Sequence, residues 1–225
     1  MRTANLLLVG AMVLALTPVG ASAQDRKFHV NFGGGPTFIN GEMGDHFKTG
    51  WGPAIGVAIG GPKAEFQFEY AYRWFDVNDN FPVLNATSLD ASHKVHQLDF
   101  NLRYTFTQQG APVRVYGIAG PGMYHRSVEI TQYVGNGVIC DPYWYVCGVY
   151  PIEDVIGSRG GWDFGFNVGA GVGFAIGEEG EFYVESRYHW VQGPEINNNS
   201  AVPVTGSSGT KANGQYWPLT FGFRF

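Results

Sequence analysis

The last ten residues, Tyr216–Phe225, alternate between large apolar side chains and other residues. Successive side chains of a β-strand point to opposite faces, so this pattern predicts a strand with one apolar face. Pro218 lies on the other face and removes a ladder hydrogen bond, so a bulge or local break is expected there. The predicted apolar face consists of Trp217, Leu219, Phe221, Phe223 and Phe225.

Seven earlier segments show the same period of two. The clearest is Glu65–Phe75, where five aromatic residues alternate with mostly polar ones, an arrangement that a helix would mix on every face. In the glycine-rich segment Val113–Tyr124 the pattern does not show which side chains share the apolar face. With the terminal strand, the predicted strands are Phe28–Phe38, Thr49–Gly60, Glu65–Phe75, His93–Phe106, Val113–Tyr124, Gly161–Gly177 and Glu181–Val191.

The connections between these segments alternate between short and long. Residues 60–64, 107–112 and 177–180 form short connections, whereas 39–48, 76–92, 125–160 and 192–212 are long. Short turns at one end and long loops at the other are typical of up-and-down barrels of the outer membrane, with both termini on the periplasmic side. The sequence therefore predicts an all-β fold, an eight-stranded antiparallel up-and-down transmembrane β-barrel.

A soluble lipocalin-like barrel would show the same alternation with its apolar face turned inward. Three observations favour the membrane barrel. Charged residues make up 15% of the chain, against about 25% in soluble domains, and the faces opposite the apolar ones are rich in Gly and Ala, as a narrow lumen requires. Tryptophans near the strand ends predict an interfacial aromatic girdle of Trp51, Trp74, Trp162 and Trp190.

The first residues have the composition of an export signal. Arg2 precedes an apolar run over residues 6–16, which is followed by Ala21-Ser22-Ala23, a small-residue cleavage pattern. We therefore expect residues 1–23 to be a cleaved signal peptide and residues 24–225 to form one barrel domain. The formal net charge of −5 and the lack of a basic run speak against nucleic acid as a partner.

Several of these features together resemble the outer-membrane β-barrel domain superfamily, which includes the OmpA membrane domain, OmpX/Ail and the opacity proteins. They are the segment Phe28–Phe38, the motif over residues 44–51, the alternating glycines 169, 171 and 173, and the terminal Phe225. The resemblance implies a bacterial outer-membrane location, contact with outer-membrane lipid and lipopolysaccharide, and insertion by the outer-membrane assembly machinery, for which the terminal strand is the signal. It implies no reaction.

Charged residues on the polar faces of four predicted strands are expected to meet in the lumen. An eight-stranded barrel is just wide enough for side chains to fill, and an unpaired buried charge costs several kcal/mol. These charges should therefore pair and close the lumen; an ion-conducting or gated pore is the alternative. The predicted lumen charge network comprises Glu65, Glu69, Arg73, Asp99, Arg103, Asp163, Glu185 and Arg187.

Cys140 and Cys147 enclose a short segment rich in Tyr and Trp within the longest predicted loop. In an exported protein two such cysteines predict one disulfide. It would either hold an aromatic tip for contact with a partner or stiffen the loop against proteolysis. A zinc site there is not expected, because tetrahedral binding needs four ligands and only His125 lies nearby in sequence.

The sequence motifs that could indicate catalysis, a metal or a cofactor are each incomplete. The Asp76–Asn80 segment lacks the Gly and Glu that a calcium loop needs. His93 and His96 lie three positions apart, so a strand points them to opposite faces. His125 and Ser127 are close in sequence, but nothing places an orienting carboxylate such as Glu129 beside them. We expect no cofactor, no metal and no enzymatic activity.

The expected function is therefore that of a non-enzymatic surface barrel. It would contribute to envelope integrity and, through its long loops, to adhesion or recognition of a host or environmental surface. The alternative is a narrow or laterally open channel for small or hydrophobic solutes, as in OmpW-like proteins. A lipid A-modifying enzyme is the third interpretation.

Overall fold

The structure is a computed structural model, and it describes residues 27–40, 44, 47–76, 89–141, 146–177, 180–193 and 213–225. The predicted signal peptide lies outside these residues. Within them, no helix is long and apolar enough to cross a membrane.

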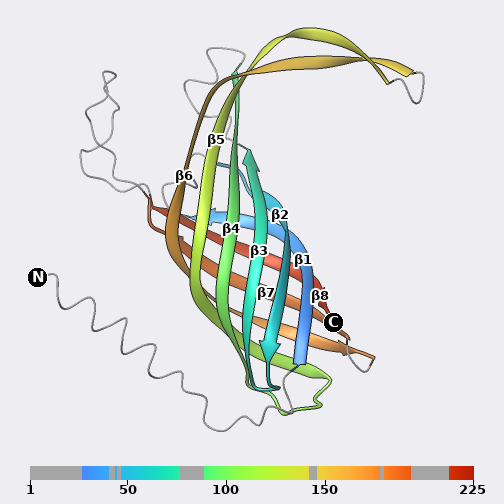
Figure 1. The fold of residues 1–225 in the computed structure, drawn as a ribbon, viewed down its shortest axis with the longest axis vertical. Coiled ribbons are helices and arrows are strands. Elements are labelled where there is room, and N and C mark those ends of the chain that lie inside the picture. Colours follow the sequence, from blue (N-terminus) through green and yellow to red (C-terminus); the bar gives the residue numbers. More distant parts are fainter. Residues whose placement is uncertain are drawn as a thin grey trace, which may run out of the picture.

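Eight antiparallel strands form one closed barrel, in which each strand pairs with its neighbours in sequence and the last pairs with the first (Figure 1). This confirms the predicted fold class. The strands are β1 (Lys27–Asn40), β2 (Gly50–Gly60), β3 (Ala64–Asp76), β4 (Leu89–Thr105), β5 (Val113–Asp141), β6 (Val146–Ile176), β7 (Gly180–Val191) and β8 (Gly214–Arg224).

Short turns connect β2 to β3, β4 to β5 and β6 to β7 at one end of the barrel, here called the short-turn end. Gly110 and Gly177 in two of these turns have φ angles of 83° and 66°, which are accessible to glycine at little cost. The backbone groups of Val30 and Phe225 exchange hydrogen bonds of 2.8 and 3.0 Å beside this end. The opposite end, where the other connections lie, is called the long-loop end.

The region 125–160 is the main correction to the predicted strands. The sequence predicts a loop, but β5 and β6 continue as one paired hairpin up to Asp141 and Val146. Figure 1 shows this hairpin extending well beyond the other strands. The pairing is irregular, with register shifts after Ile130 and Tyr133. Such shifts move side chains to the other face, and this explains why no simple alternation marks the segment.

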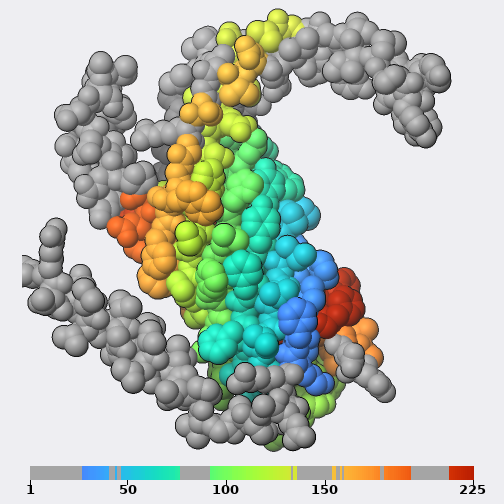
Figure 2. All heavy atoms as spheres, viewed as in Figure 1, coloured from blue at the N-terminus to red at the C-terminus, as the bar shows by residue number. Residues whose placement is uncertain are grey.

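Successive side chains of each strand point alternately to the outer wall and to the lumen, as the sequence pattern predicts. Large apolar residues such as Phe66, Phe100 and Phe164 are about half exposed on the outer wall, while polar and charged side chains of the same strands are buried in the lumen. Figure 2 shows the outer wall over β2 to β5 as a continuous surface of side chains. An apolar exterior around a polar interior is the arrangement of a membrane barrel and the reverse of a soluble one.

Proline residues interrupt the ladder on one side only. Pro218 pairs with Thr37 of β1, but the β7–β8 ladder omits residues 217 and 218. The predicted local break is therefore present, without a bulge, because the register is the same on both sides of the gap. The side chain of Pro218 is buried in the lumen, as expected. Gaps of two pairs also occur at Pro36, Pro53 and Pro121.

Glycines on the lumen face make room for tyrosines and charged groups of neighbouring strands. A Cβ atom added at Gly171 would overlap the ring of Tyr116, which lies directly across the ladder on β5. Gly222 accommodates Tyr183 in the same way. Aromatic rings thus fill the space beside these glycines, which explains how strands so rich in glycine enclose a packed interior.

Replacement of Gly171 by Ala should destabilise the barrel by about 1–3 kcal/mol, because the added methyl group overpacks the contact with Tyr116. Gly61→Ala is the matched control, since nothing lies within 4 Å of its added Cβ. The measurement is the denaturant midpoint of the barrel in detergent micelles. Equal midpoints for the two variants would contradict the packing described here.

Candidate functional site

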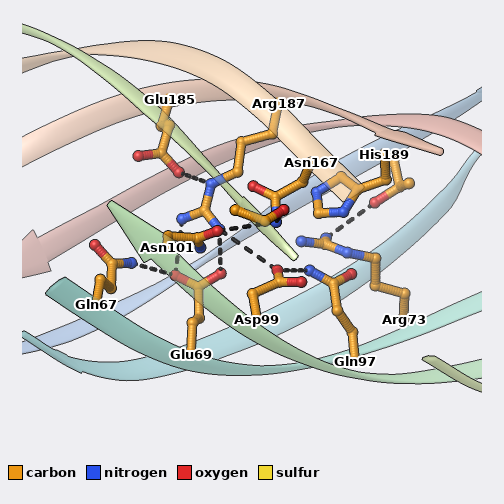
Figure 3. A network of polar contacts seen from close by, with 12 residues as sticks. Gln67, Glu69, Arg73, Gln97, Asp99, Asn101, Asn167, Glu185, Arg187 and His189 are labelled. Carbon is orange, nitrogen blue, oxygen red and sulfur yellow. Dashed lines mark hydrogen bonds and ion pairs between the residues drawn. The ribbon is translucent and has the colours of Figure 1, made fainter. Parts of the chain in front are cut away.

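Arg187 of β7 is the centre of the buried polar network in the lumen (Figure 3). Its Nη1 and Nη2 atoms each donate to one carboxylate oxygen of Glu69 on β3, both at 2.9 Å. Its Nε donates to Glu185, and its Nη1 lies 3.6 Å from Oδ2 of Asp99 on β4. All four side chains are at most 5% exposed. One guanidinium thus holds three carboxylates from three strands.

Neutral side chains extend this network to other strands. Gln67 donates to Glu69 at 2.8 Å, and Gln97 donates to Asp99. The hydroxyl of Tyr124 on β5 donates to Asp99 at 3.2 Å, and that of Tyr216 on β8 donates to Gln97 at 2.9 Å. Hydrogen bonds to ionised groups are among the stronger ones in proteins. The network therefore ties together β3, β4, β5, β7 and β8.

Arg73 does not pair with a carboxylate in the described contacts, although the charges in the lumen are expected to pair with one another. Its Nη1 instead donates to the Thr37 hydroxyl at 3.0 Å, and its Nε has no hydrogen-bond partner. Arg73 points toward the same buried region as the network, near His189 (Figure 3).

A second charged cluster lies near the short-turn end. The carboxylate of Glu181 forms ion pairs with Arg103 at 2.5 Å and with Arg114 at 3.2 Å. The Arg103 guanidinium lies 3.6 Å from the centre of the Tyr116 ring. Glu65 accepts from Arg224 of β8. A pocket of about 360 Å³ opens beside this cluster and is lined by residues that include Lys27, His29, Glu65, Arg103 and Arg114.

Asp163 lies apart from both clusters, toward the long-loop end. Its Oδ2 atom accepts from Nε of Arg126 at 2.6 Å, between β6 and β5. Sequence reasoning missed Arg126 because the alternation is lost beyond Tyr124. It also left Glu181 and Arg224 out of the network. Both residues lie on the polar faces of β7 and β8 and could have been included on that ground.

The tryptophans of the predicted aromatic girdle lie toward one end of the outer wall, and their place at a membrane interface stays a prediction. Trp51 pairs with Trp74 across the β2–β3 ladder, with ring centres 5.3 Å apart. Trp162, Trp190 and Trp217 lie on the same face toward the long-loop end. Exposed phenylalanines take this place at the short-turn end, among them Phe28, Phe106, Phe223 and Phe225.

The terminal strand points its apolar side chains outward. Trp217, Phe221, Phe223 and Phe225 are all more than 40% exposed, and Leu219 between them is half-buried. The role of this face as an assembly signal stays a prediction.

Cys140 and Cys147 face each other in the backbone ladder near the tip of the β5–β6 hairpin. Directly opposite residues of antiparallel strands have Cα atoms about 4.5 or 5.5 Å apart, and disulfides bridge Cα separations of about 4.4–6.8 Å. The register is thus compatible with the predicted disulfide, which stays a prediction, since the two side chains lie outside the described part.

A closed antiparallel barrel with an apolar wall, a polar lumen and an aromatic belt defines an outer-membrane β-barrel protein. The model of the outer membrane protein beta-barrel domain family matches residues 9–225. The chain belongs to this family and is an integral protein of the bacterial outer membrane.

Several solved structures are similar to this chain at low sequence identity. A major outer membrane protein of Thermus thermophilus is 12% identical, with 89% of this chain and 98% of that chain covered and a TM-score of 0.56. Neisserial surface protein A is 16% identical, with 88% and 97% covered and a TM-score of 0.48. OprG of Pseudomonas aeruginosa is 12% identical, with 89% and 97% covered and a TM-score of 0.44. No curated protein matches the sequence.

Replacement of Arg187 by Met should destabilise the barrel by about 3–5 kcal/mol, because it leaves three buried carboxylates without their cation. Lys94→Met is the control. It removes the partner of Glu129 from a pair that is about one-third exposed, and such pairs contribute about 0–1 kcal/mol. Unfolding in denaturant, followed by tryptophan fluorescence, measures both changes. Similar losses in the two variants would argue against a central role for Arg187.

Proposed function

We propose that the protein is a non-enzymatic surface barrel that attaches to or recognises a polypeptide partner through the β5–β6 hairpin. The observation that carries this proposal is the length of the hairpin. β5 pairs with β4 only up to Gln132, and β6 pairs with β7 only from Gly165 onward. Among the residues that the structure describes, the two strands beyond these points pair only with each other, so no third strand is described along either outer edge.

Such edges are suited to binding another strand. An exposed strand edge presents a row of unpaired N–H and C=O groups, to which an extended peptide can add. The hairpin also carries exposed apolar residues, among them Val134 at 60% and Val155 at 54% exposure. Main-chain hydrogen bonds would provide affinity, and these side chains would contribute apolar contacts.

The orientation of the barrel follows from its two unlike ends. Short turns and the terminal Phe225 lie at one end, and the hairpin extends from the other (Figure 1). In outer-membrane barrels the short turns face the periplasm. Under this proposal both termini are periplasmic and the hairpin stands on the cell surface.

The barrel itself would serve as an anchor that adds to envelope integrity. Buried ion pairs and tyrosines occupy the lumen, which supports a closed interior over the alternative of a solute channel. The carboxylate of Glu129, considered above as a catalytic partner for His125 and Ser127, is bound to Lys94 at 2.5 Å. This contact supports a role without catalysis.

The purified barrel in planar lipid bilayers should show at most rare, small conductance steps, because the lumen network occupies the path through the barrel. The Arg187→Met variant tests the reason for this, since loss of the central cation should raise the frequency of openings. Sustained large channels in the wild-type protein would favour the solute-channel alternative.

Shortening the hairpin should abolish surface binding while the barrel still folds. Residues 133–153 are replaced by Asn-Gly, which joins Gln132 to Asp154 at a point where the two residues pair and which favours a tight turn. The measurement is the adhesion of cells that produce the protein to immobilised basement-membrane proteins. We expect at least a tenfold loss.

The matched control shortens the connection between β7 and β8 and should leave adhesion unchanged. Heat-modifiable migration on gels shows that each variant is folded. Equal adhesion of the hairpin-shortened and wild-type proteins, or no adhesion by either, would contradict the proposed recognition role.

A further inference from the structure

We propose that His96 and His125 on the outer wall form a binding site for one divalent transition-metal ion of the Cu²⁺, Ni²⁺ and Zn²⁺ type. The site lies on the outer wall toward the long-loop end, among the residues of the aromatic girdle. It is separate from the lumen network and does not depend on the proposed function of the hairpin.

The ladder brings the two histidines together. His96 of β4 is directly opposite His125 of β5, and directly opposite residues project from the same face of a sheet. Their ring centres are 6.1 Å apart. Two imidazoles that share an ion at metal–nitrogen distances near 2.0–2.1 Å have ring centres roughly 5–6 Å apart. The observed separation of 6.1 Å is close to this range.

The contact between His96 and Tyr70 leaves one ring nitrogen of His96 available to bind a metal ion. Its Nδ1 lies 2.8 Å from the hydroxyl of Tyr70 on β3, so Nε2 is the nitrogen that remains for a metal. Metal-bound histidines commonly use the second ring nitrogen in this way, which fixes the tautomer and the ring orientation. Aromatic rings flank both imidazoles, with Tyr72 centred 4.9 Å from His96 and Trp162 centred 5.1 Å from His125.

The other described histidines lack such a partner. His93 is buried between the rings of Phe47 and Phe75, His189 stacks on Tyr216, and His29 lies 3.5 Å from Glu65 at the opposite end. Each pairing is with a group other than a second imidazole.

The donor set selects the kind of ion. In the described parts of the chain no group of three or more His, Cys, Asp or Glu residues is placed to hold a metal. The protein would therefore supply two imidazoles, and water or anionic headgroup oxygens would complete the coordination. Imidazole suits copper, nickel and zinc, and Cu²⁺ binds most tightly in this series. Calcium and magnesium prefer oxygen ligands and are not expected.

The direct test is a titration of the untagged barrel in detergent with Cu²⁺, followed by calorimetry and by electron paramagnetic resonance. We expect one ion per barrel, with a spectrum that shows two equivalent nitrogen ligands. His96→Gln and His125→Gln should each lower the affinity at least tenfold. His29→Gln and His46→Gln are matched controls and should bind as the wild type does.

Tyr70→Phe separates an orienting contact from simple proximity. Removing the outer hydrogen bond should lower the affinity about tenfold while both nitrogen ligands remain in the spectrum. The proposal is wrong if the wild-type protein shows no bound ion or a spectrum without two nitrogen ligands. It is equally wrong if the His96 and His125 variants bind Cu²⁺ as tightly as the controls do. The wild-type spectrum decides the question even if a variant fails to fold.

Discussion

The guanidinium of Arg187 has to neutralise carboxylates that water cannot reach. The lumen of an eight-stranded barrel is just wide enough for side chains to fill, so a carboxylate that the pleat turns inward needs a cation or a hydrogen-bond donor there. The paired bonds to Glu69 and the contacts with Glu185 and Asp99 meet this need from one position. Because Glu69 of β3 and Asp99 of β4 are on other strands than Arg187 of β7, the same contacts hold the wall together across the lumen.

The sequence predicts the fold and the facing of most side chains, because a period of two is a local property of the chain. Glu69, Asp99, Glu185 and Arg187 alternate with mostly apolar residues, so their place in the lumen follows from neighbouring positions. Which of them meet does not follow. Glu69 and Arg187 are 118 positions apart, and the stagger of the closed barrel decides their contact. Arg73 illustrates the limit, since its hydrogen bond goes to a threonine that the charge pattern cannot indicate.

Two parts of the structure escape the pattern for a physical reason. In the β5–β6 hairpin, register shifts after Ile130 and Tyr133 change which face each residue takes, and the alternation of the sequence is lost although the strands continue. His96 and His125 lie in separate predicted elements, one of them in an expected loop. Their direct opposition depends on the register of β4 and β5, which no single-strand pattern contains. A pattern within single strands therefore cannot indicate that these two histidines meet.

The prolines interrupt the hydrogen-bond ladders of the barrel wall. Each of Pro36, Pro53, Pro121 and Pro218 coincides with a two-pair gap on one side and regular pairing on the other. Among the described strands, only β8 carries such gaps along both of its edges, opposite residues 35 and 36 of β1 and residues 187 and 188 of β7. Closure of the barrel therefore depends on two ladders that are each interrupted, whereas the β1–β2 and β3–β4 ladders are continuous.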